Sequence, residues 1–254
     1  MTISRIHCSQ SLKLDSEIIL PTPAAHHLIQ VLRHKKGNKL RIFNDCDGEF
    51  YAEILSISPK KVVISIFESI INQKESPIYI HLGQAISRGD RMDYAIQKAV
   101  ELGINEITPV LATHCNVKYD QQREKSRLLH WQKIAVSAGE QCGRLTIPTI
   151  NPIVVWQDWL EKNSGDRIIC SPDCRQSLFQ NASAPERVLL LIGPEGGFSA
   201  EELEQALQDF SCRPLFLGPR ILRTETASVA ALTLLQYHWG DLSASPALSG
   251  IPAI

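Results

Sequence analysis

The pattern of hydrophobic and polar positions changes near residue 77, and the two parts predict different folds. Before this point the hydrophobic positions form short runs rich in β-branched residues, which is typical of strands. The sequence Asp45-Cys-Asp-Gly48 predicts a hairpin turn, and Thr22-Pro23 predicts the cap and start of a helix that runs to about Leu32. We therefore expect a small β-barrel-like domain over residues 1–72, followed by a polar linker. Its predicted strands are 40–43, 49–57 and 61–67.

After residue 77 the hydrophobic runs alternate between strand and helix periods. This alternation predicts an α/β domain over residues 77–240, with a parallel sheet covered by helices on both faces. Residues 241–254 are rich in Ser, Ala, Pro and Gly, and we expect them to be disordered. The predicted strands are 78–86, 104–111, 167–170, 187–193 and 214–217, and the predicted helices are 90–102, 123–138, 155–162, 200–210 and 226–238. Asp90 is the predicted cap of the first of these helices, and Gly103 is predicted to end it.

The composition is that of an ordinary globular protein. Of 254 residues, 44% are hydrophobic and 21% are charged, which excludes a mostly disordered, collagen-like or coiled-coil chain. The length favours two domains. No apolar run is long enough to span a bilayer, and the first residues lack the apolar core of a signal peptide, so we expect a cytoplasmic protein.

Net charge and cysteine content limit the partners. The formal net charge of −1 means that any nucleic acid must be bound through local basic clusters. The seven cysteines are scattered, and Cys170 and Cys174 have no second ligand pair near them in sequence. We expect free thiols in a reducing compartment and no metal site.

The sharpest motif is a buried strand that runs into Gly193-Pro-Glu-Gly-Gly197. Ser199 lies three residues before Glu202, which is the spacing of a capping box at the start of a helix. The glycines therefore occupy a strand-to-helix crevice, where α/β proteins bind ligands and where glycine lets a ligand approach the backbone. A ligand site is favoured over a tight turn without a ligand. The spacing matches neither Gly-x-Gly-x-x-Gly nor a Walker loop, which disfavours an ordinary dinucleotide or ATP site.

A second motif repeats this arrangement. The strand 214–217 meets Gly218-Pro219, and the polar stretch Arg223-Thr-Glu-Thr226 precedes a helix. Thr224 or Thr226 is expected to cap this helix, while Arg223 faces either solvent or a ligand. Because the two glycine-marked strand ends are close in sequence, we expect them to lie side by side and to share one crevice.

A basic cluster lies in the N-terminal part. The run Arg33–Arg41 carries five Lys or Arg residues and no acidic residue. Contacts to RNA phosphates and a plain solvated loop are equally compatible with such a run.

Taken together, these segments resemble the SPOUT class of S-adenosylmethionine-dependent RNA methyltransferases and, more narrowly, the ribosomal RNA small subunit methyltransferase E family. The resemblance covers nearly the whole chain. One departure is His114, at a position where the family often has Arg. Besides the two glycine loops, the matching segments are Arg88–Gly103, Ile107–Val110, Glu140–Arg144, and Val31-Leu-Arg33 with the following Gly37.

The resemblance implies a fold, a cofactor and a reaction. It implies a PUA-like RNA-binding barrel, a C-terminal domain with a deep trefoil knot at about 189–238, and a homodimer with S-adenosylmethionine in each knot. The family methylates N3 of uridine-1498 in 16S rRNA, so RNA of the small ribosomal subunit is the implied partner. Since uracil N3 carries a proton at neutral pH, a cation that favours the anion and a base that takes the proton would both assist.

The motifs and the resemblance assign the candidate site residues. Arg223 is expected to stabilise the uridine anion, and Glu225 is expected to act as the base, unless it pairs with an arginine or caps backbone amides. The residues expected to bind the cofactor are Cys170, Ser171, Ile192, Gly193, Pro194, Glu195, Gly196, Gly197, Leu217, Gly218, Ile221, Leu222 and Thr226. The residues expected to contact RNA are Arg5, Arg33, Lys35, Lys36, Lys39, Arg88, Arg91, Lys118, Glu140, Gln141 and Arg144.

Two other classes of function remain open at this point. A non-catalytic RNA-binding protein could retain the same fold, although the intact loops at Gly193 and Gly218 speak against it. A small-molecule enzyme could use another nucleotide, but the basic N-terminal domain would then have no obvious purpose.

Overall fold

The computed structural model describes residues 3–58, 61–72, 74–116, 121–171, 179 and 183–243. The chain forms two compact units. The barrel unit comprises Met1–Glu75 together with Val136–Ile147, and the sheet unit comprises Ser76–Ala135 and Pro148–Ile254. The predicted disordered tail lies outside the described residues from position 244 onwards. Within the described ranges, no helix is long and apolar enough to span a membrane.

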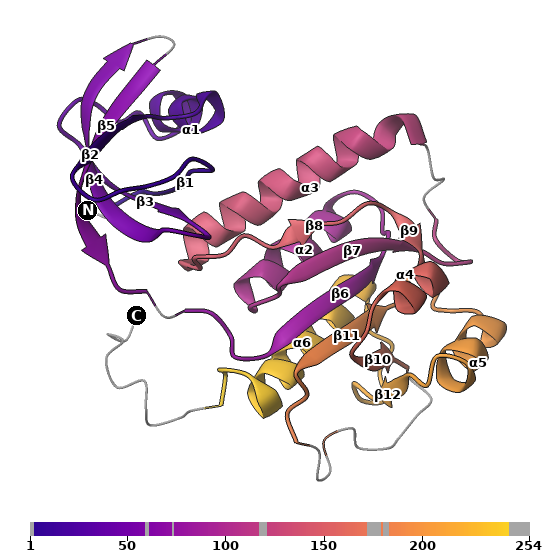
Figure 1. Cartoon of the computed structure of the whole chain (residues 1–254). Coiled ribbons are helices and arrows are strands. Elements are labelled where there is room, and N and C mark those ends of the chain that lie inside the picture. Colours follow the sequence, from indigo (N-terminus) through magenta and orange to yellow (C-terminus); the bar gives the residue numbers. More distant parts are fainter. Residues whose placement is uncertain are drawn as a thin grey trace. The chain divides into compact units, whose positions relative to one another are not determined.

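The barrel unit is built on a five-stranded sheet in the order β1-β3-β4-β5-β2 (Figure 1). Strand β1 pairs with β3 in parallel, and the other pairs are antiparallel, including the predicted hairpin β3–β4. The core gathers alternate strand residues such as Leu40 and Ile42 around the buried Leu28. The strands are β1 (Arg5–His7), β2 (Ser16–Ile19), β3 (Lys39–Asn44), β4 (Gly48–Ser58) and β5 (Lys61–Ile70).

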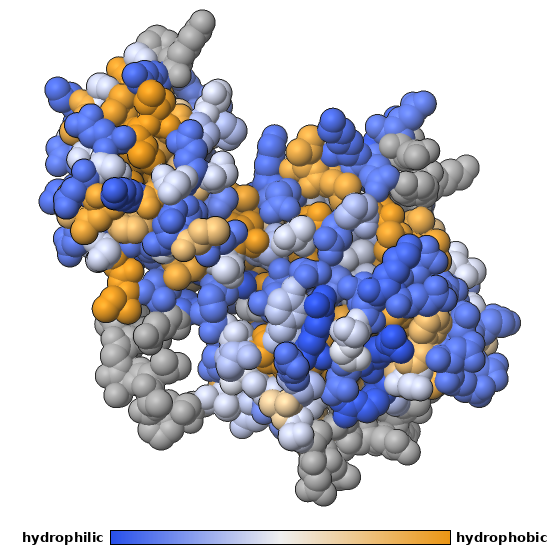
Figure 2. Space-filling view, in the orientation of Figure 1, coloured by the Kyte–Doolittle hydropathy of each residue, from blue (hydrophilic) through white to orange (hydrophobic). Residues whose placement is uncertain are grey.

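The helical segment of the barrel unit differs from its prediction. Helix α1 (Thr22–His26) gives way to a π-helical turn, η1 (His27–Val31), instead of continuing as one regular helix. The N-cap of α1 is Pro21 and no side chain caps the helix, so Thr22 is its first residue rather than its cap. Apolar residues appear among hydrophilic ones on the face of this unit seen in Figure 2, and Val31 and Phe67 are among its exposed apolar residues.

The sheet unit contains a parallel sheet in the order β12-β10-β11-β6-β7-β8, with β9 also paired to β7 (Figure 1). Every strand pair in it is parallel, which confirms the predicted sheet type. The sequence did not predict the two-residue strands β8 and β9, nor β1 and β2 of the barrel unit. The strands are β6 (Tyr79–Ala85), β7 (Glu106–Leu111), β8 (Thr149–Ile150), β9 (Val154–Val155), β10 (Asp166–Cys170), β11 (Arg187–Ile192) and β12 (Arg213–Leu215).

Helices cover both faces of this sheet. On one face, Leu189 and Leu191 of β11 pack in a core with Trp156, Trp159 and Ala206. On the other face, α6 lies against β11 and packs on α2. The helices are α2 (Asp90–Glu101), α3 (Gln121–Cys142), α4 (Trp156–Lys162), α5 (Ala200–Gln208) and α6 (Thr224–Trp239).

Two helix ends of the sheet unit test the capping predictions. The N-cap of α2 is Gly89, so Asp90 is the first helical residue and not the cap. The prediction of a glycine after the helix is confirmed, because Gly103 follows the C-cap residue Leu102 with a φ of +80°, a conformation that glycine adopts without strain.

Candidate functional site

Three parallel strands of the sheet unit, β11, β10 and β12, end at one cavity of about 430 Å³. The prediction that the two glycine-marked strand ends lie side by side is wrong, because β10 lies between β11 and β12. Cys170 and Ser171 at the end of β10 fill the space between the two loops, and both line the cavity. The crevice outside the carboxyl ends of parallel strands is the usual ligand site of an open α/β sheet.

The cavity collects nearly the whole predicted cofactor set. All of those residues line it except Thr226, which is exposed in the first turn of α6. Sequence reasoning missed six lining residues, of which four belong to flanking strands and helices and two, Phe198 and Arg220, lie in the glycine loops themselves. The missed residues are Phe198, Leu203, Leu215, Arg220, Thr224 and Ala227.

Thr224 joins the two loops. Its hydroxyl donates a hydrogen bond to the Gly193 carbonyl at 2.6 Å, and Gln84 Nε2 donates to the same hydroxyl oxygen at 3.0 Å. The N-cap of α6 is Arg223 and no side chain caps the helix, so the prediction that Thr224 or Thr226 caps it is wrong. The hydroxyl of Thr224 instead fixes the start of α6 to the loop after β11.

The loop after β11 is fixed by the predicted capping box. Ser199 Oγ accepts from the Glu202 amide, and Glu202 Oε2 accepts from the Ser199 amide. Burial raises the pKa of Glu202, but hydrogen bonds from Ser199, Thr113 and Trp156 outweigh it and hold this pKa below its usual value. The carboxylate of Glu202 therefore stays charged and holds the glycine loop in place.

The two carboxylate oxygens of Glu195 lie in different environments. Its Oε1 accepts from Arg91 Nη1 at 3.2 Å and from the Arg88 amide at 3.4 Å. Its Oε2 is buried and has no hydrogen-bond partner among the described residues. Since a buried polar atom without a partner is costly, this oxygen is available to a bound ligand.

Burial raises the pKa of the Cys170 thiol to about 12. Cys170 therefore lines the cavity as a neutral group, not as a thiolate. The neutral thiol of Cys170 is a much weaker nucleophile than a thiolate would be.

The two predicted catalytic residues begin α6 but do not line the cavity. Arg223 is exposed and precedes Thr224, which does line the cavity. Glu225 is half-buried, and its Oε2 has no hydrogen-bond partner within the described part of the chain. Both residues are sequence neighbours of the lining residue Thr224.

The predicted basic RNA cluster forms an exposed loop on the barrel unit. Arg33, Lys35, Lys36 and Lys39 are all exposed. The loop is held by hydrogen bonds from the Gly37 amide to the Ile54 carbonyl, 2.8 Å, and from the Lys35 amide to Asn38 Oδ1, 2.8 Å. The structure thus presents these cations on an ordered turn.

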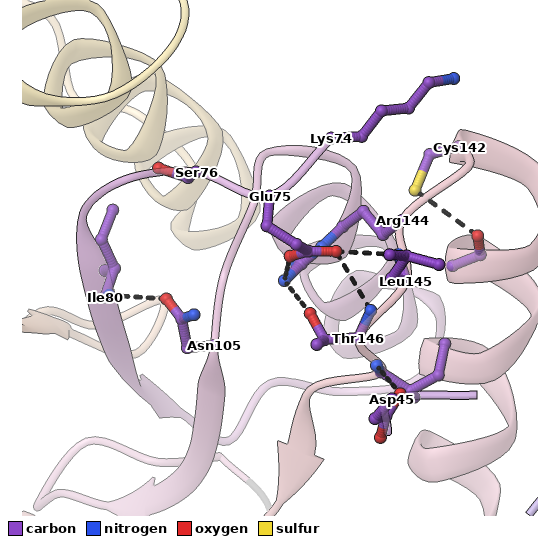
Figure 3. Close-up of polar contacts among 12 residues, drawn as sticks. Asp45, Lys74, Glu75, Ser76, Ile80, Asn105, Cys142, Arg144, Leu145 and Thr146 are labelled. Atoms are coloured by element: carbon purple, nitrogen blue, oxygen red, sulfur yellow. Dashed lines mark hydrogen bonds and ion pairs between the residues drawn. The ribbon is translucent and has the colours of Figure 1, made fainter. Parts of the chain in front are cut away.

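Two other predicted RNA contacts are buried within the barrel unit. Arg5 is 6% exposed and pairs with Glu49 at 2.8 Å, and Arg144 is 3% exposed and pairs with Glu75 at 2.7 Å. Figure 3 shows the Glu75 carboxylate facing Arg144 and the backbone at Leu145 and Thr146.

Glu140 also serves the barrel unit itself, because its Oε1 accepts from the His7 amide at 3.0 Å. Burial raises the pKa of Glu140. The structure therefore uses Arg5, Glu140 and Arg144 in internal contacts.

The remaining RNA candidates are more accessible. Gln141 is exposed on α3, and Arg88 and Arg91 are exposed at the start of α2. Lys118 lies outside the described residues. Across the described ranges, no three His, Cys, Asp or Glu side chains are placed to bind a metal ion.

Comparison with known protein families assigns the class of the chain. A model described as an RNA methyltransferase domain matches residues 74–236, and a model described as an RNA methyltransferase PUA domain matches residues 20–67. The fold and the cavity thus belong to an RNA methyltransferase that carries a PUA domain.

The family within this class is the ribosomal RNA small subunit methyltransferase E family, to which the chain belongs. It is 42% identical to the Buchnera aphidicola (Schizaphis graminum) protein of that name, over 95% of this chain and 98% of the relative. It is 31% identical to the Bacillus subtilis protein, over 84% and 87% of the two chains.

Two solved structures share the whole fold. A Legionella pneumophila protein described as a methyltransferase, solved with bound S-adenosylmethionine, has a TM-score of 0.91 and 37% identity. The Neisseria gonorrhoeae ribosomal RNA small subunit methyltransferase E, also bound to S-adenosylmethionine, has a TM-score of 0.86 and 34% identity. Each match covers 95% of this chain and 100% of the solved one.

Proposed function

We propose that the protein is an S-adenosylmethionine-dependent methyltransferase that modifies N3 of a uridine in small-subunit ribosomal RNA, with uridine-1498 of 16S rRNA as the position. The observation that carries this proposal is the single cavity formed by the two glycine loops and the end of β10. It unites almost every residue that the family resemblance assigns to the cofactor.

The cavity suits this cofactor in size and chemistry. Its volume of about 430 Å³ lies within the range of about 300–1,000 Å³ typical of small-molecule sites. Leu217, Ile221 and Leu222 give it apolar walls for a flat ring, while the glycine loops expose backbone groups. The unpartnered Oε2 of Glu195 can accept from an ammonium or hydroxyl group. When bound, S-adenosylmethionine supplies an electrophilic methyl group.

The chain's own residues must prepare the acceptor. Arg223, exposed next to the lining residue Thr224, is placed to favour the uridine anion by its charge. Glu225 is the proposed acceptor of the N3 proton, because one of its carboxylate oxygens is buried without a partner among described residues. Glu195 has the same property and lines the cavity, so it is a second candidate for this role.

A second copy of the chain is proposed to complete the site. Ile221 lines the cavity and yet is 95% exposed, which leaves a large apolar side chain for another surface to cover. The apolar residues Leu232, Leu235 and Trp239 of α6 are buried in the chain's own core, so the proposed interface uses other residues. We propose a cytoplasmic homodimer, and the trefoil knot remains a prediction from the resemblance.

The test of the function is to map methylated nucleosides in ribosomal RNA from cells with and without this protein. We expect loss of N3-methyluridine at one position of 16S rRNA, restored by the wild-type gene. Comparing Glu225→Gln with Glu195→Gln in single-turnover methylation then identifies the base, since only the base variant should lose rate with both affinities retained. Unchanged methylation in the deletion strain would indicate an RNA-binding protein without catalysis.

A further inference from the structure

The sheet unit contains a second cavity, of about 790 Å³, which the proposed function has not used. It lies where β6 ends, between the start of α2 and the first half of α3. The cavity is lined by residues that include Arg88, Gly89, Arg127, His130 and Trp131.

This cavity shares a wall with the cofactor cavity. Arg88 lines the larger cavity and Glu195 lines the cofactor cavity, and the Arg88 amide donates to Glu195 Oε1 at 3.4 Å. The strands that lead to the two cavities, β6 and β11, are neighbours, and the last residue of β11, Ile192, is in register with Gln84, one residue before the end of β6. A molecule in the larger cavity therefore lies directly beside the proposed methyl donor.

The lining combines cations with an apolar floor. Met92 and Trp131 are buried below the cavity, at 1% and 5% exposure, and offer apolar surface to a base. Two acidic side chains, Asp90 and Asp93, also line the cavity. Asp93 accepts a hydrogen bond from His130 Nε2 at 2.8 Å, and Asp90 lies in the first turn of α2. The three arginines at its border are Arg88, Arg123 and Arg127.

Arg127 is a cation of this cavity that is available to a ligand. The residue is half-buried on α3, and it has no ion-pair or hydrogen-bond partner among the residues that the structure describes. The guanidinium of Arg88, in contrast, donates to the Asn116 carbonyl at 2.9 Å. The first amides of α2 also lie at this border, because its N-cap is Gly89 and no side chain caps them, while Asp90 and Asp93 in its first turn offset part of the positive potential.

We propose that the larger cavity holds the acceptor nucleotide of single-stranded RNA, with Arg127 on a phosphate and the base directed toward the shared wall at Glu195. This inference rests on the proposed function. A phosphate matches the unpaired guanidinium and the uncapped helix, a base matches the apolar floor, and a volume of about 790 Å³ accommodates a whole nucleotide.

The test uses two variants of one helix. Arg127→Gln and Lys125→Gln each remove one positive charge from α3, but Lys125 is exposed and does not line the cavity. The probe is a single-stranded RNA oligonucleotide with the 16S rRNA sequence around uridine-1498. Because hydrogen bonds to charged groups are the strong ones, Arg127→Gln should weaken RNA binding about tenfold, while S-adenosylmethionine affinity stays unchanged and Lys125→Gln stays within about twofold.

Equal RNA affinities of Arg127→Gln and Lys125→Gln would overturn the inference. As a second measurement, 4-thiouridine at the acceptor position should crosslink under ultraviolet light to a peptide from 86–93, 127–131 or the shared wall at 193–197, and crosslinks confined to other peptides would also overturn it. Both measurements report binding. A wild-type protein that binds and crosslinks RNA as expected but transfers no methyl group would therefore overturn the proposed function and retain the nucleotide site.

Discussion

The Thr224 hydroxyl donates to the Gly193 carbonyl at 2.6 Å and connects two segments that are 31 residues apart in the chain. Both residues line the proposed cofactor cavity. The hydroxyl is buried at 4% exposure, and its second contact, with Gln84, lies at the end of β6. One hydroxyl thus sets the distance between the two loops that must enclose the cofactor.

Thr224→Val should weaken both stability and cofactor binding. The variant keeps the shape of the side chain but removes the donor to the Gly193 carbonyl and one of the two acceptors of Gln84 Nε2, a loss of about 1–3 kcal/mol in unfolding free energy. Thr233→Val is the matched control, because Thr233 is exposed on the same helix and its hydroxyl donates only to the Val229 carbonyl. Denaturant unfolding and calorimetry with S-adenosylmethionine give the two readouts, and equal behaviour of both variants would contradict this role.

Gly196 is expected to be intolerant of any side chain because of His114. A Cβ on Gly196 would lie 2.9 Å from the His114 Cβ, which is closer than real Cβ contacts allow. Gly196→Ala should therefore displace the glycine loop and lower S-adenosylmethionine affinity about tenfold or more. The double variant Gly196→Ala/His114→Gly removes the clashing atom and should regain affinity relative to Gly196→Ala. Calorimetry measures the S-adenosylmethionine affinity of the wild type, the two single variants and the double variant. If the double variant binds no better than Gly196→Ala, the loss of affinity does not come from the clash with His114.

Arg223→Ala is expected to lower the methyl-transfer rate about a hundredfold, the scale for removing one preorganised electrostatic donor. S-adenosylmethionine affinity should persist, since Arg223 does not line the cavity. Arg223→Lys should recover only part of the rate, because an ammonium does not reproduce the planar guanidinium. Single-turnover methylation of small-subunit particles, with both affinities measured separately, tests this. Normal turnover would exclude the role, and loss of cofactor binding would move Arg223 into the cofactor site.

The exposed basic loop should carry the salt dependence of RNA binding. Lys35→Ala/Lys36→Ala should reduce the slope of log affinity against log salt by about 1.4, because each lost contact to a single-stranded phosphate reduces it by about 0.7. Lys39 is left in place, because its ammonium lies 5.3 Å from the centre of the Phe67 ring. The control Lys13→Ala/Lys61→Ala removes the same charge from other exposed sites of the barrel unit. Equal slopes for the two double variants would make the loop a plain solvated turn.

Protein stability should fall as the pH drops from 6.5 toward 4 because of His81. Its Nε2 accepts from the Trp159 indole N–H at 3.0 Å, and an indole nitrogen can only donate, so the imidazole must be neutral. Burial lowers the pKa of His81 from 6.5 to about 4. Between these values the unfolded chain binds a proton that the folded chain does not, so stability is complete above pH 6.5 and is lost as pH falls through this window.

His81→Gln should flatten the pH dependence in this window, while losing some stability at pH 7. Denaturant unfolding of the wild type and the variant between pH 5 and 7 measures this pH dependence. The carboxylates of Glu75 and Glu202 do not interfere, because their pKa values are held below the ordinary 4.5 and their contributions are lost only at lower pH. A wild-type stability that stays constant over this range would contradict the assignment.

The sequence predicted where the site lies, but it did not predict the contacts that hold the site together. The glycine loops and the box Ser199–Glu202 are local signals, so spacing alone located the loops and the helix start. The position of β10 between β11 and β12 depends on strand order, which spacing does not carry. Thr224 looked like a helix cap from its place in the sequence, and only the fold brings its hydroxyl to the Gly193 carbonyl.

Charge was the least reliable guide to surface function. Arg5 and Arg144 are the same residue type as Arg88, and a basic residue in an RNA-binding family suggests a phosphate contact. Their acidic partners, Glu49 and Glu75, lie 44 and 69 residues away in the chain, so no local pattern indicates the pairing. Arg127 shows the opposite case, since it belongs to no motif and lines a cavity only because the fold brings α3 beside the start of α2.

The barrel unit is built from two separate segments of the chain, so it cannot be transferred to another protein as one continuous segment. The Arg5 guanidinium reaches carbonyl oxygens of Gly139 and Arg144, which return to this unit some 130 residues after Arg5. A truncation after Glu75 would keep the ion pair of Arg5 with Glu49 but remove two carbonyl acceptors of its guanidinium, at a cost of about 1.5–3 kcal/mol for each hydrogen bond. The barrel unit therefore cannot be transferred by itself, and any chimera must inherit residues 136–147 along with the N-terminus.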